Sequence, residues 1–482
     1  MSNSSHHPLV VDLDGTLIKT DLLLESASQF VLSRPWQAYK LLVWLAQGIS
    51  MLKSRLAEAT SIDAATLPYN ADLLTWLQQE KAQGRSIVLA TASHQLLADQ
   101  VAAHLGLFDE VLASDACTNL KSETKRAALV AKFGEKGFDY VGNDWADMAV
   151  WQSAAVSHVV SQSGRLIDAV RHLGNLGQVF GDGKPPLAQA MIKAMRPHQW
   201  MKNLLIFIPL LAAHRYAMVS STGAALLAFV VFGLTASSVY LQNDLVDVAA
   251  DRHHARKRHR PFAAGHLSLL HGWLAWPLLL MGAFTLAALT LPWTVSVSLG
   301  AYFVLTVAYS LRLKQIPMID VLTLAGLYTL RIIAGAAAIA VPLTFWLLSF
   351  SMFLFLSLAF IKRYSELQIA RDEGKNTALL GRGYSPHDLD LVANLGGSAG
   401  YTGVLVLALY IQDSHTASLY ATPQFIWLAC PILLYWISRA WLIAHRGQMH
   451  DDPIVFALKD RVSWAVAALF AAVFVLAKVA TV

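Results

Sequence analysis

Nine apolar runs of about twenty residues occupy most of the chain from Asn203 onward, and they restrict its possible folds more than any other feature. Each run is long enough to cross the hydrocarbon core of a bilayer as a helix. The predicted spans are 203–221, 223–242, 272–291, 293–311, 318–338, 341–361, 391–411, 424–443 and 462–481. The sequence therefore predicts an all-α, nine-helix transmembrane bundle embedded in a lipid bilayer.

The first 180 residues instead alternate short apolar and polar segments, as soluble domains do. The glycines and paired prolines of 174–186 interrupt any continuing helix, so we predict a linker there, between a domain at 1–173 and the membrane domain at 187–482. The chain has only two cysteines, Cys117 and Cys430, which argues against a disulfide framework and against a cysteine-based metal site.

Basic residues gather in one alternate set of the predicted connections. The run Arg252–Arg260 holds five of them, whereas the opposite set carries Arg215 and almost no other. This asymmetry predicts that the basic loops and the N-terminal domain are cytoplasmic, at the inner (plasma) membrane, and that the C-terminus lies on the opposite side. Basic loops of this kind suit anionic lipids and phosphate substrates, and we expect no nucleic-acid partner.

An acidic ladder stands where the second apolar run meets this basic segment. Asn243, Asp247 and Asp251 are four residues apart, so on a helix they share one face with about 6 Å of rise between neighbours. With Asp244 in support, these oxygen ligands suit one or two Mg²⁺ ions bridged by a polyphosphate. Like charges repel at a membrane surface unless a cation is present. The alternative interpretation is a solvated helix end paired with the following arginines.

The N-terminal segment predicts a second acidic site. Pro8–Leu17 reads as a buried strand that ends in Asp12, Asp14 and a glycine turn. The carboxyl ends of parallel strands meet at one edge of an α/β sheet, where ligands bind. A carboxylate nucleophile, a hydroxyl, an ammonium group and further acids for Mg²⁺ make a phosphoryl-transfer site. The later candidates follow the predicted strands 86–90 and 138–141 or open a helix: Thr91, Lys125, Asp144 and Asp147.

These residues resemble the haloacid dehalogenase phosphatase superfamily over about residues 8–170. The resemblance implies an α/β Rossmannoid domain with a helical cap at about 21–80. Asp12 would be the nucleophile and Asp14 the general acid/base, while Thr91 and Lys125 would bind phosphate. Mg²⁺ would be held by Asp12, Asp14, Asp144 and Asp147. The usual Gly-Asp of the fourth motif is Gly142–Asn143 here, so both an active phosphatase and a degenerate structural domain stay open.

Further polar clusters flank the predicted membrane helices. Arg331 lies about three turns inside the fifth helix, and an arginine at that depth normally faces a polar cavity. Together with the acidic ladder, these bases predict a pocket in which acids hold Mg²⁺ and cations neutralise phosphate oxygens, although positive-inside anchoring explains several of them singly. The candidate phosphate-binding residues are Lys202, Lys257, Arg260, Tyr309, Lys314, Arg331 and Lys362.

The acidic motif, Asn243-Asp-x-x-Asp-x-x-x-Asp251, is followed by Lys257-x-x-Arg260–Pro261 and resembles the first Asp-rich motif of the UbiA-type prenyltransferase superfamily. This resemblance covers about residues 187–482. Three further stretches are similar to its decaprenyl-phosphate phosphoribosyltransferase-like branch: Arg196–Asn203, Tyr309–Lys314 with Asp320, and Lys362–Leu367. The second motif of aromatic prenyltransferases, Asp-x-x-x-Asp, is not visible after the fourth helix.

The resemblance implies a Mg²⁺-dependent transferase that moves 5-phosphoribose from phosphoribosyl diphosphate to a polyprenyl phosphate. Asn243, Asp244, Asp247 and Asp251 would hold the metal, with Asp247, Asp251 and Lys314 closest to the chemistry. The haloacid dehalogenase-like domain would then dephosphorylate the product or a related phosphate.

Other functions stay open at this point. A prenyltransferase could use the same motif to attach a prenyl group from prenyl diphosphate to an aromatic or other acceptor. A transporter is disfavoured, because a permeation path needs charges near the bilayer midplane and most charges here lie at one face. The late loop 449–453 is acidic enough to touch a metal or a ribose, and helix capping explains it equally well.

Overall fold

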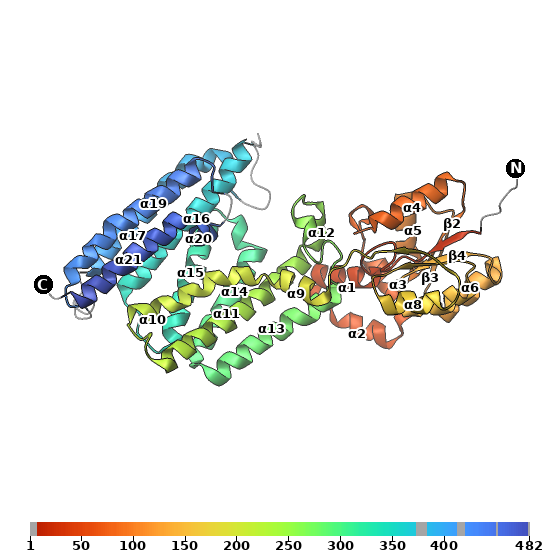
Figure 1. Ribbon diagram of the computed structural model, residues 1–482, viewed down its shortest axis with the longest axis horizontal. Helices are drawn as coiled ribbons and strands as arrows, with labels where there is room; N and C mark the ends of the chain where they lie inside the picture. The colour runs from red at the N-terminus through yellow and green to blue at the C-terminus, as the bar shows by residue number, and fades with distance from the viewer. Residues whose placement is uncertain (1–6, 373–382, 412–419, 450–451, 481–482) are drawn as a thin grey trace. The chain divides into compact units, whose positions relative to one another are not determined.

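The computed structural model describes residues 7–372, 383–411, 420–449 and 452–480, which form two compact units (Figure 1). The first unit contains residues up to 195 together with 240–276, and the second contains 196–239 and the residues from 277 onward. The segment that carries the acidic ladder therefore belongs to the same unit as the N-terminal domain.

A six-stranded parallel sheet, in the order β3-β2-β1-β4-β5-β6, forms the centre of the first unit. Val10 of the central strand β1 pairs with Val88 on one side and Tyr140 on the other. Both faces of β1 are buried, which explains its uninterrupted apolar sequence. The strands are β1 (Leu9–Val11), β2 (Ile87–His94), β3 (Glu110–Ser114), β4 (Asp139–Gly142), β5 (Ser157–Val160) and β6 (Leu176–Phe180).

Helices cover both faces of this sheet (Figure 1). Those packed with Leu9 and Val11 are α4 (Ala71–Ala82) and α5 (Gln95–Leu105), and those packed with Val10 are α6 (Glu123–Phe133), α7 (Met148–Ser153) and α8 (Gly164–Arg171). The predicted α/β Rossmannoid domain is confirmed. The helices that follow β1 are α1 (Leu22–Ser33), α2 (Tyr39–Ala46) and α3 (Ile49–Ala59). The cap predicted at 21–80 extends too far, because Leu73 and Leu77 of α4 lie in the sheet core.

The linker predicted at 174–186 is wrong over part of its length. Residues 176–180 form the edge strand β6, in which Leu176 pairs with Ser157 and Phe180 with Val160 of β5. Gly177 of β6 is typical of a loop, but an edge strand tolerates glycine. The backbone pairing that stabilises β6 comes from β5, which is a separate segment of the sequence. After β6, α9 (Leu187–Met195) is the last helix before the second unit.

Eight helices in the described residues are long and apolar enough to cross a membrane, which confirms the helical bundle. Shorter elements connect them: η4 (Pro197–Phe207), α10 (Ile208–Ala212), α12 (Val248–His253), η5 (Lys257–His259), η6 (Leu313–Gln315), η7 (Pro386–Asp388), η8 (Pro423–Leu428) and α20 (Pro453–Lys459). The long helices are α11 (Val219–Val246), α13 (Leu269–Thr290), α14 (Trp293–Leu311), α15 (Ile319–Ala338), α16 (Phe345–Asp372), α17 (Leu389–Ile411), α19 (Ala429–His445) and α21 (Arg461–Val479).

The first predicted span, 203–221, is not one long helix. It is replaced by the 3₁₀ segment η4 followed by the short helix α10, and His214 ends this stretch with a φ of 53°. Pro209, inside the predicted span, lacks a backbone N–H, which disfavours a continuous α-helix. A 3₁₀ helix rises faster than an α-helix, so η4 and α10 together still extend about 30 Å, close to the thickness of the hydrocarbon core.

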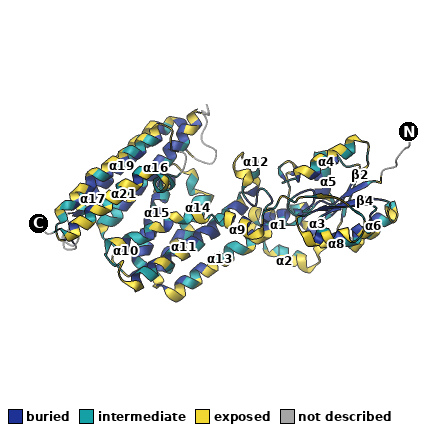
Figure 2. Ribbon diagram, in the orientation of Figure 1, coloured by how far each residue is buried: buried dark blue, intermediate teal, exposed yellow. Residues whose placement is uncertain are grey.

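The long helices differ in how much of their surface the protein covers, as Figure 2 shows by colour. Helix α15 is 72% buried over its most apolar window, whereas α13 and α21 are each 17% buried. On α13, Leu274, Leu278 and Met281 are exposed at a spacing of three or four residues, which places them on one helix face. Apolar faces of this kind are stable in contact with lipid, and the chain is an integral membrane protein.

Candidate functional sites

A cavity of about 200 Å³ lies at the carboxyl edge of the sheet. It is lined by residues at the carboxyl ends of three neighbouring strands and by lysines from two helices. These include Asp12, Asp14, Ser93, Asn143, Asp144 and Asp147 at the sheet edge, with Lys53 from α3 and Lys125 from α6. The sequence motifs predicted to form a phosphoryl-transfer site therefore meet in one place.

Asp12 follows β1 and is 7% exposed. Its Oδ1 lies 2.6 Å from the Lys125 ammonium and its Oδ2 accepts a 3.1 Å hydrogen bond from Thr16. Burial raises the pKa of Asp12 to about 6, although Lys125 opposes the rise. A carboxylate oriented by an ammonium group and a hydroxyl is suited to attack a phosphorus atom, since Lys125 also provides positive charge for the phosphoryl oxygens.

Asp14 is held by three donors, two from β2 and one from α1. Its Oδ1 accepts from the backbone N–H of Leu22 at 2.9 Å, and its Oδ2 accepts from Ser93 at 2.6 Å and from Thr91 at 3.3 Å. Gly15, with a φ of 77°, makes the turn that directs the two acids to the same edge. Burial and the neighbouring Asp21 raise the pKa of Asp14 to about 7, a value suited to a general acid and base at neutral pH.

The fourth motif, residues 142–147, contains two acids, Asp144 and Asp147, and the sequence did not indicate which of them is the better placed to bind Mg²⁺. Asp147 is buried; its Oδ2 accepts from the backbone N–H groups of Asn143 and Asp144, and its Oδ1 accepts from Tyr140. Asp144 is exposed and lines the cavity. Asp147 therefore orders the loop, and Asp144 is the more accessible of the two carboxylates.

This donor set has the chemistry that Mg²⁺ requires, because carboxylate and amide oxygens are its usual protein ligands. Within the described ranges no three His, Cys, Asp or Glu side chains are gathered closely enough to form a metal cluster. Instead, Lys125 binds Asp12 and Ser93 binds Asp14. Asp12, Asp14 and Asp144 line the same cavity with Asn143 as a neutral neighbour, and their role as Mg²⁺ ligands stays a prediction.

We expect Asp144→Asn to raise the Mg²⁺ concentration needed for half-maximal hydrolysis of p-nitrophenyl phosphate by on the order of tenfold or more. Asp147→Asn removes a loop contact and should mainly lower the midpoint of thermal unfolding. Steady-state hydrolysis across a Mg²⁺ titration and a thermal melt distinguish the two effects. Equal Mg²⁺ requirements for wild type and Asp144→Asn would contradict the ligand assignment.

The acidic ladder lies at the end of α11 and in α12 rather than on one unbroken helix. The break falls at Asp247, but the backbone keeps the four-residue spacing: Asp247 N–H donates to Asn243 O at 2.9 Å, and Asp251 N–H donates to Asp247 O at 2.7 Å. The predicted helical spacing is therefore present. The predicted single helix is wrong, because the chain departs from regular helix at Asp247.

Arg260 joins two acids of this motif. Its Nη1 lies 3.1 Å from Asp244 Oδ1 and 2.6 Å from Asp251 Oδ2, and both carboxylates are 1% exposed. Lys257 lies 3.9 Å from Asp251. Burial raises the pKa of Asp251, and Arg260 opposes this rise. Pairing of the acids with a following arginine is the alternative that the sequence left open, and it is present here. Two buried carboxylates that share one cation are also suited to a divalent metal.

In the second unit, Asp452 joins two lysines that are far apart in sequence. Its Oδ2 lies 2.9 Å from Lys202 of η4 and 3.2 Å from Lys362 of α16, and Tyr328 of α15 donates a hydrogen bond to it at 3.3 Å. Burial alone would raise the pKa of Asp452, but the two lysines hold this pKa well below its usual range. Asp452 also caps α20 through Ile454 N–H.

The sequence predicted both lysines but not their common partner. For the acidic loop 449–453 the sequence predicted contact with a metal or a ribose or, equally, helix capping, and Asp452 does cap α20. In the same predicted acidic loop, His450 and Asp451 lie outside the described residues.

Arg331, a predicted phosphate-binding residue, has its guanidinium bonded to protein groups. It is 5% exposed and donates to Asn203 Oδ1 at 2.9 Å, Leu327 O at 2.6 Å and Tyr302 OH at 3.2 Å. Its guanidinium also lies 4.9 Å from the centre of the Tyr302 ring. These partners satisfy it within the protein, in place of the polar cavity expected for it. Arg331 thus connects α15 to η4, next to Lys202, and is suited to position that lysine.

A second buried pair explains two motif residues as structural. Arg363 and Asp320 have fully buried side chains 2.6 Å apart, and Tyr384 donates to Asp320 at 2.7 Å. The pair joins α16 to the start of α15. The remaining candidates, Tyr309 of α14 and Lys314 of η6, are half-buried in the same unit.

Comparison with known proteins also divides the chain into an N-terminal sheet domain and a membrane domain. Residues 204–463 match the family model of the UbiA prenyltransferase family, and residues 9–136 match that of the haloacid dehalogenase-like hydrolases. The uncharacterised protein y4nM of Sinorhizobium fredii is 36% identical over 475 residues, covering 98% of this chain and 91% of that protein. Decaprenyl-phosphate phosphoribosyltransferase of Mycolicibacterium smegmatis is 33% identical over 302 residues, covering 60% of this chain and 93% of that protein.

Among solved structures, a UbiA homolog from Archaeoglobus fulgidus bound to GPP and Mg²⁺ covers 60% of this chain and 99% of its own, with 16% identity and a TM-score of 0.45. The UbiA match includes more than half of the chain, and the second match falls on the sheet domain. The chain belongs to the UbiA prenyltransferase family, as an integral membrane transferase with an N-terminal haloacid dehalogenase-like domain.

Proposed function

We propose that the membrane part transfers 5-phosphoribose from phosphoribosyl diphosphate to a polyprenyl phosphate, with Mg²⁺ bound at Asn243, Asp244, Asp247 and Asp251. The observation that carries this proposal is the basic character of the second unit. Lys202 and Lys362 both contact the carboxylate of Asp452. Tyr309 and Lys314 occupy the part of the sequence in which aromatic prenyltransferases carry a second acidic motif for prenyl diphosphate. The 33% identical phosphoribosyltransferase supports the same donor.

The chain's residues suggest how such a transfer proceeds. An oxygen of the polyprenyl phosphate attacks the anomeric carbon, the new C–O bond forms, and the bond to the diphosphate oxygen breaks. An anionic nucleophile needs little help from a base, so positioning and charge neutralisation dominate the rate. We assign neutralisation to Lys202, Lys257, Arg260, Lys314 and Lys362. Bound Mg²⁺ would supply further charge neutralisation for the diphosphate group.

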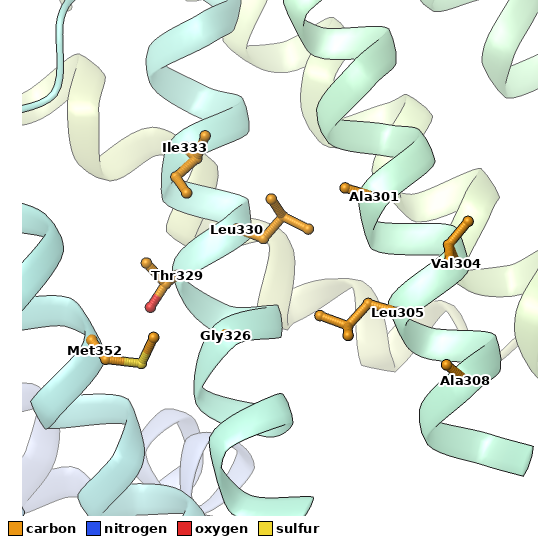
Figure 3. Close-up of a pocket in the computed structure, with 9 residues that line it drawn as sticks. All are labelled: Ala301, Val304, Leu305, Ala308, Gly326, Thr329, Leu330, Ile333 and Met352. Atoms are coloured by element: carbon orange, nitrogen blue, oxygen red, sulfur yellow. The ribbon is translucent and has the colours of Figure 1, made fainter. Parts of the chain in front are cut away.

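Side chains of α14, α15 and α16 line a pocket of about 490 Å³ (Figure 3). Apart from the Thr329 hydroxyl its lining is apolar, and Gly326 has open space where a side chain would begin. Ala308, at one end of the lining on α14, precedes the candidate residue Tyr309. We propose that part of the isoprenoid chain of the acceptor lies here, because an apolar chain with an anionic head suits an apolar pocket beside a basic helix end.

Gly326→Leu should fill part of this pocket. We expect the variant to lose on the order of tenfold in kcat/KM for a long-chain polyprenyl phosphate, the size of effect that a few buried methylene groups produce. A short-chain soluble isoprenyl phosphate should be used as well as by wild type. Equal losses for both acceptors would contradict the assignment.

The donor is tested directly with purified protein, polyprenyl phosphate, and labelled phosphoribosyl diphosphate or labelled prenyl diphosphate. We expect label from phosphoribosyl diphosphate in the lipid product, and Asp251→Asn should lower kcat by about 100-fold or more because it removes a charged ligand. Transfer from prenyl diphosphate alone would instead support a prenyltransferase. Full activity of an Asp247→Asn and Asp251→Asn double variant would overturn the site.

We further propose that the N-terminal domain removes the 5-phosphate of the lipid product or of a related phosphate. Asp12 and Lys125 are in contact, the pKa of Asp14 is suited to acid–base chemistry, and oxygen ligands surround one cavity. Fusion to the transferase would raise the local concentration of the substrate. The basic loops favour a cytoplasmic location for the N-terminal domain and for the acidic ladder at the plasma membrane, with the C-terminus on the other side.

Asp12→Asn should leave transfer intact but cause the 5-phosphorylated lipid to accumulate, because the nucleophile is lost. Mass spectrometry of the extracted lipid product identifies the extra phosphate. The same product from wild type and Asp12→Asn would show that the domain does not act on this lipid.

A further inference from the structure

A buried ion pair joins the N-terminal domain to the segment that carries the acidic ladder. Arg252 of α12 donates from Nη2 to Glu25 Oε1 at 2.6 Å and from Nη1 to Oε2 at 3.2 Å. The side chains are 6% and 9% exposed. Thr20 donates to Glu25 at 2.7 Å, and Arg252 Nε donates to Ala263 O at 3.2 Å. A two-pronged, buried arginine–carboxylate contact fixes both distance and direction.

Two neighbouring contacts hold the same segments together. Trp273, at the start of α13, donates to the Ser28 hydroxyl on α1 at 3.1 Å. Gly265 has a φ of 69°, and a Cβ built there would lie 2.6 Å from the Cβ of Lys19. The loop between α12 and α13 therefore approaches the residues before α1 so closely that only glycine fits. Charge, hydrogen bonding and close packing all connect residues 252–273 to α1 and the turn before it.

Helix α1 contacts Asp14 of the phosphatase-like cavity directly and reaches the acidic ladder through Arg252. The N–H of Leu22, its first residue, donates to Asp14 of the phosphatase-like cavity, and Glu25 lies in its first turn. At the other end of the ion pair, Arg252 directly follows Asp251, which is buried and bound to Arg260. Movement of Arg252 would displace the backbone that carries the Asp251 carboxylate.

We propose that α1 positions the metal-binding acids of the transferase, with Glu25 acting through Arg252 on Asp251. Glu25 is thus a positioning residue for the membrane reaction, although it belongs to the haloacid dehalogenase-like domain. The proposal rests on the proposed function in one respect, that Asp251 ligates a divalent cation. Loss of either partner leaves a buried charge without its counter-charge, and α12 must then shift to solvate it.

The test measures Mn²⁺ binding by electron paramagnetic resonance, in full-length protein carrying Asp12→Asn to weaken the other acidic site. In this background we expect Glu25→Gln and Arg252→Gln each to weaken Mn²⁺ binding by on the order of tenfold, as loss of a contact behind a metal ligand does. The double variant should be no weaker than either single one, because both changes remove the same contact. Transfer assays on the Asp12-intact forms should show a matching rise in the Mg²⁺ requirement.

Asp63→Asn is the matched control. Asp63, between α3 and α4, lies 3.7 Å from His253 of α12 and so also contacts the segment that carries the acidic ladder, but both side chains are more than half exposed, so Mn²⁺ binding should not change. Glu25→Asp retains the charge and guards against a misfolded Glu25→Gln; it should give an intermediate loss with an unchanged melting midpoint. If Asp251→Asn abolishes Mn²⁺ binding while Glu25→Gln and Glu25→Asp leave it unchanged, the positioning proposal is overturned. If Asp251→Asn has no effect on Mn²⁺ binding, the proposed metal site itself fails.

Discussion

Buried carboxylates require a cation, and this constraint organises each candidate site of the chain. Asp12 is paired with Lys125, Asp244 and Asp251 share Arg260, and Asp452 is shared by two lysines. An unpaired charge away from water costs several kcal/mol, so each site contains its own counter-charge. Cations in contact with buried acids are also the groups that can turn toward a phosphate when a metal or substrate arrives.

Not every buried charge belongs to a site. Arg363 with Asp320, and Arg331 with Asn203 and Tyr302, are enclosed by protein groups and join helices of the bundle. Their burial resembles that of the site acids, but the cations that we assign to the transferase are partly exposed, with Arg260 at 26% and Lys362 at 28%, whereas Arg363 and Arg331 are buried. This difference in exposure distinguishes residues that position others from residues that can reach a substrate. Arg331, which binds Asn203 next to Lys202, belongs to the first group.

The two proposed sites of the chain share a structural element. Helix α1 donates a backbone hydrogen bond to Asp14 at its start and receives Arg252 on Glu25 one turn later. We therefore propose two contributions of the fused domain, a reaction of its own and support for the neighbouring acidic motif. A chain whose phosphatase chemistry had decayed would still retain a reason to keep this domain folded.

The sequence by itself determined both fold classes and most candidate residues, because hydrophobic period, strand-end acids and the spacing of Asn243, Asp247 and Asp251 are local properties. Only the tertiary structure decided how those residues are used. It showed that residues 176–180 pair with a distant strand, that Asp452 joins Lys202 to Lys362, and that Glu25 meets Arg252 across 227 positions of sequence. Such partners come from different elements, and no local pattern specifies which of many charged side chains the fold will bring within hydrogen-bonding distance.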